Sequence, residues 1–515
     1  MEEALLGGSL RGRRWDVFVE ELKKVSYIAI PMVVVTVSQH LLRVVSMMMI
    51  GHLSELSLSG AAIATSLTNV TGFSLLVNFL SSLPLLFNFI CFYNSNVKFR
   101  YSNARPGTGK GLDSGMQFGM SSALETLCGQ AYGAEDYRKL GIYTNGAIIS
   151  LLVVCIPISV LWLFVDKFLI LIGQDPLISI EAGKYSSWLI ATLFPYAILQ
   201  ALIRYLQTQS LILPMLMSSI AALCFHVPLC WALVFKLNLG SGGAAIAIGL
   251  SYSFNVLLLC LYVKYSSSCE KTRLCFTKEV FPSTKEFCHL AIPSASMVCL
   301  EWWTSEIVIL LAGLLPKPQL ETSVLSICLL VSSLHYFIPF SIGAGASTRI
   351  SNELGAGNPE AARMSVLSVT VLGIAEAIVA SIVLLCSCRV LGYAFSNEKE
   401  VVYYLRDMTP LLCLLIATDC IQAVLSGVAR GSGWQHLGAY VNLGSYYLVG
   451  IPVAILLGFF LHLKGKGLWI GLNAGSLVQS LLFSLITCLT DWQKQASIAR
   501  ERIFHSKECA RLLAN

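Results

Sequence analysis

The sequence consists largely of runs of about 20 apolar residues separated by short polar connections. A run of this length crosses the hydrocarbon core of a bilayer when it forms an α-helix. An open sheet is excluded there, because lipid offers no partner for unpaired backbone groups. Only 12% of the residues are charged, against about 25% in soluble domains. The chain is therefore predicted to be an all-α membrane protein.

Twelve such runs are predicted to be transmembrane helices. In the first half they cover 26–51, 60–76 continuing at 118–129, 140–164, 185–206, 211–236 and 242–264. In the second half they cover 287–314, 321–346, 363–388, 402–428, 435–461 and 466–489. Lys and Arg concentrate in the connections on the side of the two tails, which predicts that both termini are cytoplasmic. The charged N-terminus lacks an apolar core and is not predicted to be a signal peptide.

The second half of the chain repeats features of the first. Gly133-Ala134 recurs as Gly355-Ala356, and Gly249-Leu250 recurs at the same spacing as Gly471-Leu472. Six helices in each half give two lobes of equal orientation, related by an axis along the membrane normal. The predicted domains are a cytoplasmic N-tail (1–25), an N-terminal lobe (26–266), a cytoplasmic linker (267–286), a C-terminal lobe (287–490) and a cytoplasmic C-tail (491–515).

A third repeat pair reveals extra sequence in the first lobe. Ala29-Ile30-Pro31 and Ala291-Ile292-Pro293 are about 40 residues further apart than the other pairs. The extra length falls at 77–117, whose polar, Gly-rich latter part would interrupt the second membrane helix. We interpret this segment as a translated intron or a splice variant, with an extramembrane loop as the alternative. Sequencing the transcript separates the two, because only the first interpretation predicts a message without these codons.

Two carboxylates interrupt the apolar run 287–314, at Glu301 and Glu306. An ionised side chain near the centre of a membrane helix costs about 2.5–3.5 kcal/mol, so an acid there indicates a functional site. A desolvated carboxyl group favours its protonated form, and it can release the proton when its surroundings change. Asp419, in the run 402–428, is the second candidate. If the two acids lie close together, their titration belongs to the pair.

In the sequence repeat, Gln39 occupies the position equivalent to Glu301, and Arg43 occupies the position equivalent to Ser305. The acid is therefore present in the C-terminal lobe only, and proton coupling is predicted there. An intramembrane carboxylate also suits an organic cation, for which a tryptophan ring offers a cation–π contact. The residues predicted to line the substrate cavity are Gln39, Arg43, Trp302, Trp303 and Glu306. Glu306 lies roughly 140° around the helix from Glu301, so the two are not expected to share a face.

The remaining polar residues within apolar runs are interpreted as structural. His226 and His335 are predicted to form hydrogen bonds between helices, and Glu125 is predicted to order the turn that follows it. No partner is predicted for Glu376. A membrane-embedded hydrolase or acyltransferase would need a paired nucleophile and base or a metal motif such as HExxH, and the sequence contains neither. No enzymatic activity is therefore expected.

Several motifs resemble one known family. They are VVSMMMIGHL at 44–53, ETLCGQAYGA at 125–134, AIPSASMVCLEWW at 291–303, RISNELGAGNP at 349–359 and ARGSG at 429–433. With these motifs, the chain resembles the plant-type DETOXIFICATION branch of the multidrug and toxic compound extrusion (MATE) family. The resemblance implies two six-helix bundles in a V and export of organic solutes in exchange for H⁺ or Na⁺. It maps the acid of the seventh helix onto Glu301 and the carboxylate of the tenth onto Asp419.

The expected function is antiport of an organic solute against H⁺ rather than Na⁺, with no cofactor or metal. The expected partners are the bilayer and a small solute such as an organic cation, flavonoid or alkaloid. The modest net charge of +6 does not point to nucleic acid, and a monomer is expected. Plasma membrane and vacuolar membrane are both compatible with the sequence. Two alternatives are a flippase for lipid-linked solutes, which would favour a cavity rich in Arg and Lys, and an inactive splice isoform.

Overall fold

The computed structural model describes residues 2–54, 56–65, 115–171, 173–273, 279–395 and 398–512. These residues form helices joined by turns, and no strand occurs among them. Eleven of their helices are long and apolar enough to cross a membrane. The prediction of an all-α membrane protein is confirmed, and eleven of the twelve predicted spans fall on these helices.

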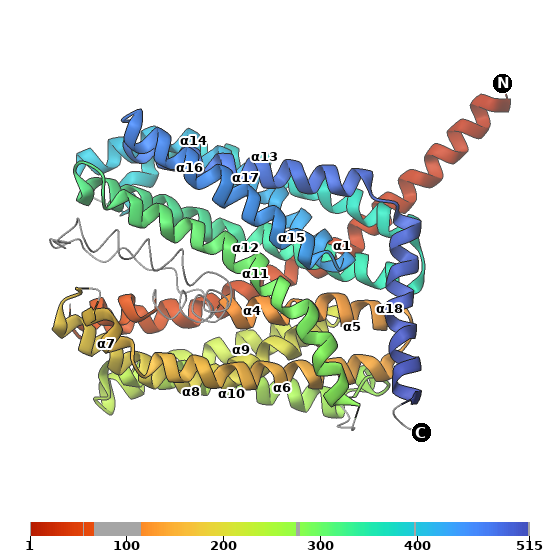
Figure 1. Ribbon diagram of the computed structural model, residues 1–515, viewed down its shortest axis with the longest axis horizontal. Helices are drawn as coiled ribbons and strands as arrows, with labels where there is room; N and C mark the ends of the chain where they lie inside the picture. The colour runs from red at the N-terminus through yellow and green to blue at the C-terminus, as the bar shows by residue number, and fades with distance from the viewer. Residues whose placement is uncertain are drawn as a thin grey trace.

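The first half of the chain forms one group of helices (Figure 1). They are α1 (Glu2–Gly51), the short apolar helix Leu56–Thr65, α4 (Gly115–Ser121), α5 (Ala123–Gly133), α6 (Tyr137–Trp162), α7 (Val165–Leu171), α8 (Pro176–Thr208), α9 (Ile212–Trp231), η1 (Ala232–Lys236), α10 (Gly240–Tyr265) and η2 (Ser267–Cys269). The predicted second span is described at Leu56–Thr65 and from α4 into α5. Residues 66–114, with most of the predicted insertion 77–117, lie outside the described residues.

The second half forms the other group. It contains α11 (Val280–Ala312), α12 (Pro318–Ala356), α13 (Pro359–Phe395), α14 (Lys399–Ser432), α15 (Gln435–Asn442), η3 (Leu443–Gly450), α16 (Ile451–Ile455), η4 (Leu456–Phe460), α17 (Lys464–Leu489) and α18 (Trp492–Leu512). The elements from α15 to η4 together make one candidate membrane span, Gln435–Phe460. We call the two groups the first and the second lobe.

The repeat-related helices α1 and α11 each pass from one lobe to the other (Figure 1). Val25 and Ala29 of α1 pack in a core formed mainly by the second lobe, whereas Leu42 and Ile50 pack in the core of the first. In α11 the order is reversed, since residues 287–299 contribute to the first lobe's core and residues 308–312 to a core of the second. Each lobe therefore holds part of a helix that belongs to the other by sequence.

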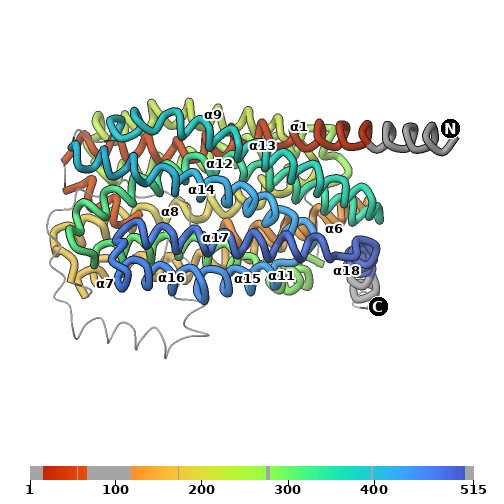
Figure 2. Tube along the Cα trace, turned by 90° about the horizontal axis from the view of Figure 1, so that it is seen from above, coloured from red at the N-terminus to blue at the C-terminus, as the bar shows by residue number. Residues whose placement is uncertain are grey.

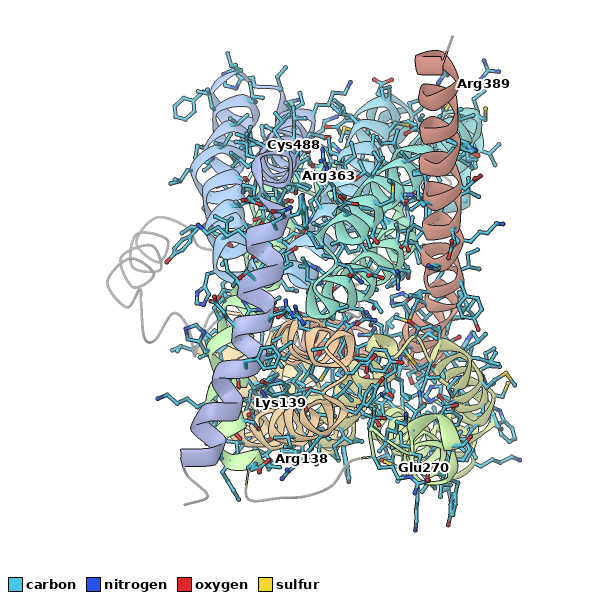
Figure 3. All side chains as sticks on the ribbon, turned by 90° about the vertical axis from the view of Figure 1, so that its right-hand side faces the viewer. Arg138, Lys139, Glu270, Arg363, Arg389 and Cys488 are labelled. Atoms are coloured by element: carbon cyan, nitrogen blue, oxygen red, sulfur yellow. The ribbon has the colours of Figure 1, made fainter. Side chains whose placement is uncertain are left out.

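One end of the molecule is covered by α18, and we call it the α18 end. Viewed from above, the long helices run side by side along the long axis, and α1 begins at the same end (Figure 2). Figure 3 shows α18 lying across this end over both lobes. Its apolar residues Trp492, Ala496 and Ala499 are buried against the second lobe. Lys139 of α6, in the first lobe, donates to the carbonyl oxygen of Ile503.

Candidate functional site

A cluster of polar side chains lies inside the second lobe. Glu301 on α11 is partly buried and accepts hydrogen bonds from Tyr336 on α12 at 3.2 Å and from Gln422 on α14 at 2.7 Å. Asp419, on α14, accepts a hydrogen bond from Ser476 on α17 at 2.9 Å. The two carboxylates are close enough to interact electrostatically. Four helices therefore bring the two acids singled out in the sequence into one polar site.

A chain of amides extends this polar cluster toward α15. The hydroxyl of Tyr446 donates to Gln479 Oε1 at 2.7 Å, and Gln479 Nε2 donates to Asn442 Oδ1 at 2.7 Å. Asn442 in turn donates to the backbone carbonyl of Met297 at 2.6 Å. These residues are buried, and their hydrogen bonds fix the orientation of α11 against α15 and α17.

A small cavity lies beside Glu301, where the two lobes meet. Its volume is ≈ 20 Å³, which is room for about one water molecule. Drug-sized ligands occupy pockets of about 300–1,000 Å³, so the cavity in this structure is too small for a solute of that size. The cavity is lined by Phe118, Met297, Val298, Glu301, Trp302, Tyr336, Phe340, Ser426 and Arg430.

Aromatic rings form much of the wall of this cavity. Phe118, on α4, stacks on Trp302 with ring centroids 5.8 Å apart and lies 5.3 Å from the Phe340 ring. Trp303 instead packs against the core of the first lobe. The adjacent tryptophans thus point to different surroundings, and only Trp302 lines the cavity.

The structure does not bring the other predicted cavity residues to this position. Gln39, Arg43 and Glu306 are not among the residues that line the cavity beside Glu301. Gln39 is buried, and Arg43 interacts with His40 and with Tyr185 of the first lobe.

The sequence interpretation of Glu125 was wrong. This residue lies on α5 with no solvent exposure, and its carboxylate joins Arg204 of α8 and Arg430 of α14, each at 3.0 Å. It therefore connects the two lobes rather than ordering a turn. Sequence reasoning misses both arginines, because they lie near the ends of predicted helices, where the positive-inside rule already accounts for basic residues. The available signal was that Arg204 lies within the apolar run 185–206.

A second polar cluster lies between α12, α13 and α14. His335 Nε2 and Glu376 Oε1 are 2.6 Å apart, and Cys420 Sγ donates to Glu376 Oε2 at 2.7 Å. The sequence predicted no partner for Glu376, and the structure supplies two. The hydrogen bonds predicted for the two histidines are confirmed, since His226 also joins α9 to Ser46 of α1 and Ser251 of α10.

Comparison with known proteins agrees with this architecture. A family model described as MatE matches residues 115–232 and 293–456. Protein DETOXIFICATION 14 of Arabidopsis thaliana is 51% identical over 488 residues, covering 95% of this chain and 92% of that protein. Protein DETOXIFICATION 8 of the same plant is 51% identical over 484 residues, covering 94% of this chain and 91% of that protein.

Solved structures have the same fold. The crystal structure of the eukaryotic MATE transporter AtDTX14 matches with a TM-score of 0.83 and 50% identity, covering 95% of this chain and all of that one. An outward-facing multidrug resistance MATE transporter matches with a TM-score of 0.73 at 13% identity, over 93% of this chain and 97% of that chain. At that identity the second match supports the fold alone.

The two-lobed helical fold and these matches define a secondary transporter of the efflux class. The chain belongs to the MATE family and is similar to the plant DETOXIFICATION proteins, as its motifs predicted.

Proposed function

We propose that the protein exports organic solutes in exchange for H⁺, which binds at the Glu301–Asp419 pair. The observation that carries this proposal is the contrast between two acids. Glu125 is held by two guanidinium groups, whereas Glu301 is held by the neutral donors Tyr336 and Gln422. A carboxylate between guanidiniums stays ionised, while one among neutral donors in a poorly hydrated site can be discharged by a proton.

The pair carries one negative charge in its resting state. Two neighbouring carboxylates in a site of low polarity do not both ionise, so they hold one proton between them. A second proton, or the cationic group of a solute, then competes for the remaining charge. The rings of Phe118, Trp302 and Phe340 offer faces for cation–π contact with such a solute. If H⁺ and the solute compete for this one negative charge and reach it from opposite sides of the membrane, their exchange is antiport.

The proposed orientation places the α18 end in the cytoplasm. This end carries many basic residues of the connections and the last helix, which the positive-inside rule assigns to the cytoplasmic side. They include Arg138, Lys139, Arg349, Arg363, Arg500 and Arg502. In this orientation, the Glu125 contact closes the cytoplasmic side, and it must break for a solute to enter from the cytoplasm. A monomer in the plasma or vacuolar membrane suffices for this cycle.

The test is uphill transport by purified protein in proteoliposomes. With an imposed pH gradient, accumulation of a fluorescent planar organic cation is measured for the wild type and for E301Q and D419N. Each amide variant is expected to lose at least about tenfold in rate, a factor that corresponds to ~1.4 kcal/mol. E306Q is the matched control, because Glu306 lies on the same helix and does not line the cavity. Undiminished uphill transport by both E301Q and D419N would refute the proposal.

A further inference from the structure

The contact between the lobes near the α18 end contains an unbalanced set of buried charges. Glu125 and Arg204 belong to the first lobe and Arg430 to the second, and the exposed fractions of the three residues are 0%, 1% and 5%. One carboxylate therefore faces two guanidiniums, each at 3.0 Å. Removing charges from water is costly unless they are balanced. This group carries one net positive charge and needs a further negative charge nearby.

Arg430 reaches both the lobe contact and the proton site. Its Nε donates to Glu125 Oε2 at 3.0 Å, while its side chain lines the cavity that also contains Glu301. Its buried Nη2 has no hydrogen-bond partner among the described residues. The guanidinium carbon lies 5.6 Å from the centroid of the Phe340 ring, another residue of the cavity wall. One side chain therefore connects Glu125 with the surroundings of Glu301.

The charges near Glu301 can be counted from all of the elements packed around it. Asp419 and Arg430 come from α14, Tyr336 from α12 and Tyr446 from η3. Beyond Asp419, its neighbour Cys420 contacts Glu376 of α13, which in turn contacts His335 of α12. With the tyrosines neutral and one proton on the acid pair, the pair contributes one negative charge. Together with Glu125, Arg204 and Arg430 the set is then electrically neutral. A second proton, or an organic cation, leaves one positive charge uncompensated in the closed lobe contact.

We propose that Arg430 is a positioning residue that locks the empty transporter with the α18 end closed, until H⁺ or a cationic solute neutralises the Glu301–Asp419 pair. This inference rests on the proposed function. Neutralisation leaves the buried guanidinium with insufficient countercharge, and opening the α18 end to water relieves that imbalance. Both exchanged cations act by the same physical step, whereas the empty, charged site holds the lobes together.

The test measures opening of the α18 end as a function of pH. Spin labels are attached through unnatural amino acids at exposed positions 270, next to the first lobe, and 360, on the second. This leaves the seventeen native cysteines unchanged. In the wild type, the population with a long label distance is expected to grow as the pH falls from 8 to 5.5. R430Q is expected to lose this dependence, and in proteoliposomes to lose uphill accumulation while it retains downhill flux.

Arg349 provides the matched control. It also forms a poorly exposed ion pair, with Glu21 at 2.9 Å on the part of α1 that packs against the second lobe, but it does not line the cavity. R349Q is expected to keep the pH-dependent change of the wild type. E125Q supplies an independent test if R430Q does not fold, because it adds one uncompensated positive charge and is expected to open the α18 end already at pH 8.

The outcomes separate the two proposals. If E301Q and D419N abolish transport while R430Q keeps the wild-type response to pH, the lock is refuted and the proton site stands. The lock is also refuted if E125Q stays closed at pH 8. If E301Q and D419N transport normally, the proton site itself is refuted.

Discussion

Gly133 and Gly355 occupy equivalent positions in the two sequence repeats, and each packs against the other's helix. A Cβ atom added to Gly133 on α5 would overlap the carbonyl oxygen of Asn352 on α12. A Cβ atom added to Gly355 on α12 would overlap the carbonyl oxygen of Gln130 on α5. The repeat therefore creates a reciprocal contact of two backbones, which closes the α18 end without any intervening side chain.

This contact predicts the effect of adding a single methyl group. G133A and G355A are each expected to destabilise the closed arrangement, because the opposing atoms are backbone and cannot turn aside. Overpacking of this kind typically costs about 1–3 kcal/mol. Thermal unfolding of the purified variants in detergent should show a lower midpoint. G444A is the control, since nothing lies within 4 Å of a Cβ atom at that position; an equal loss in all three variants would contradict the explanation.

The shared acid pair predicts how solute binding depends on pH. Because a proton and an organic cation compete for one charge, binding of the cation should strengthen as the pH rises and the proton leaves. For a single competing proton, the apparent Kd falls by up to about tenfold per pH unit. Equilibrium binding of a fluorescent cation between pH 5.5 and 8 measures this slope. The double variant E301Q/D419N, which carries no carboxylate at the site, should bind weakly at every pH with a flat profile, and a wild-type slope in it would place the competition elsewhere.

Deletion of the extra segment 77–117 of the first lobe is predicted to increase the transport rate. Removing residues 77–117 joins the run 60–76 directly to 118–129 and restores the spacing of the repeats. The shortened chain is expected to transport faster than the intact one, with both measured at equal protein in proteoliposomes. Equal rates would show that the segment does not interfere, and would support its interpretation as an extramembrane loop.

Two arginines of α18, Arg500 and Arg502, are predicted to differ in how strongly they stabilise this helix. Arg502 donates to Gln130 of the first lobe at 2.8 Å, whereas Arg500 lies against Gly357 of the second lobe. Of these two arginines, Arg502 is therefore the one that ties α18 to the first lobe. A charge-assisted hydrogen bond contributes about 1.5–3 kcal/mol, so R502Q should speed amide hydrogen exchange in α18 by roughly tenfold or more. R500Q should have a smaller effect, and equal effects would argue against the cross-lobe tie.

The sequence by itself determined the membrane class, eleven of the spans and the acids worth testing. These follow from local properties, because the length of an apolar run and a carboxylate within it need no knowledge of neighbouring helices. The motifs likewise sufficed to identify the family.

Only the tertiary structure decided which of these residues meet. The pairing of Glu125 with Arg204 and Arg430 and the crossing of α1 and α11 between the lobes depend on which helix faces come together. A sequence repeat specifies equivalent positions but not the contacts between them. Those contacts are set by close packing and charge balance across the interface between the lobes, which no single stretch of the chain contains.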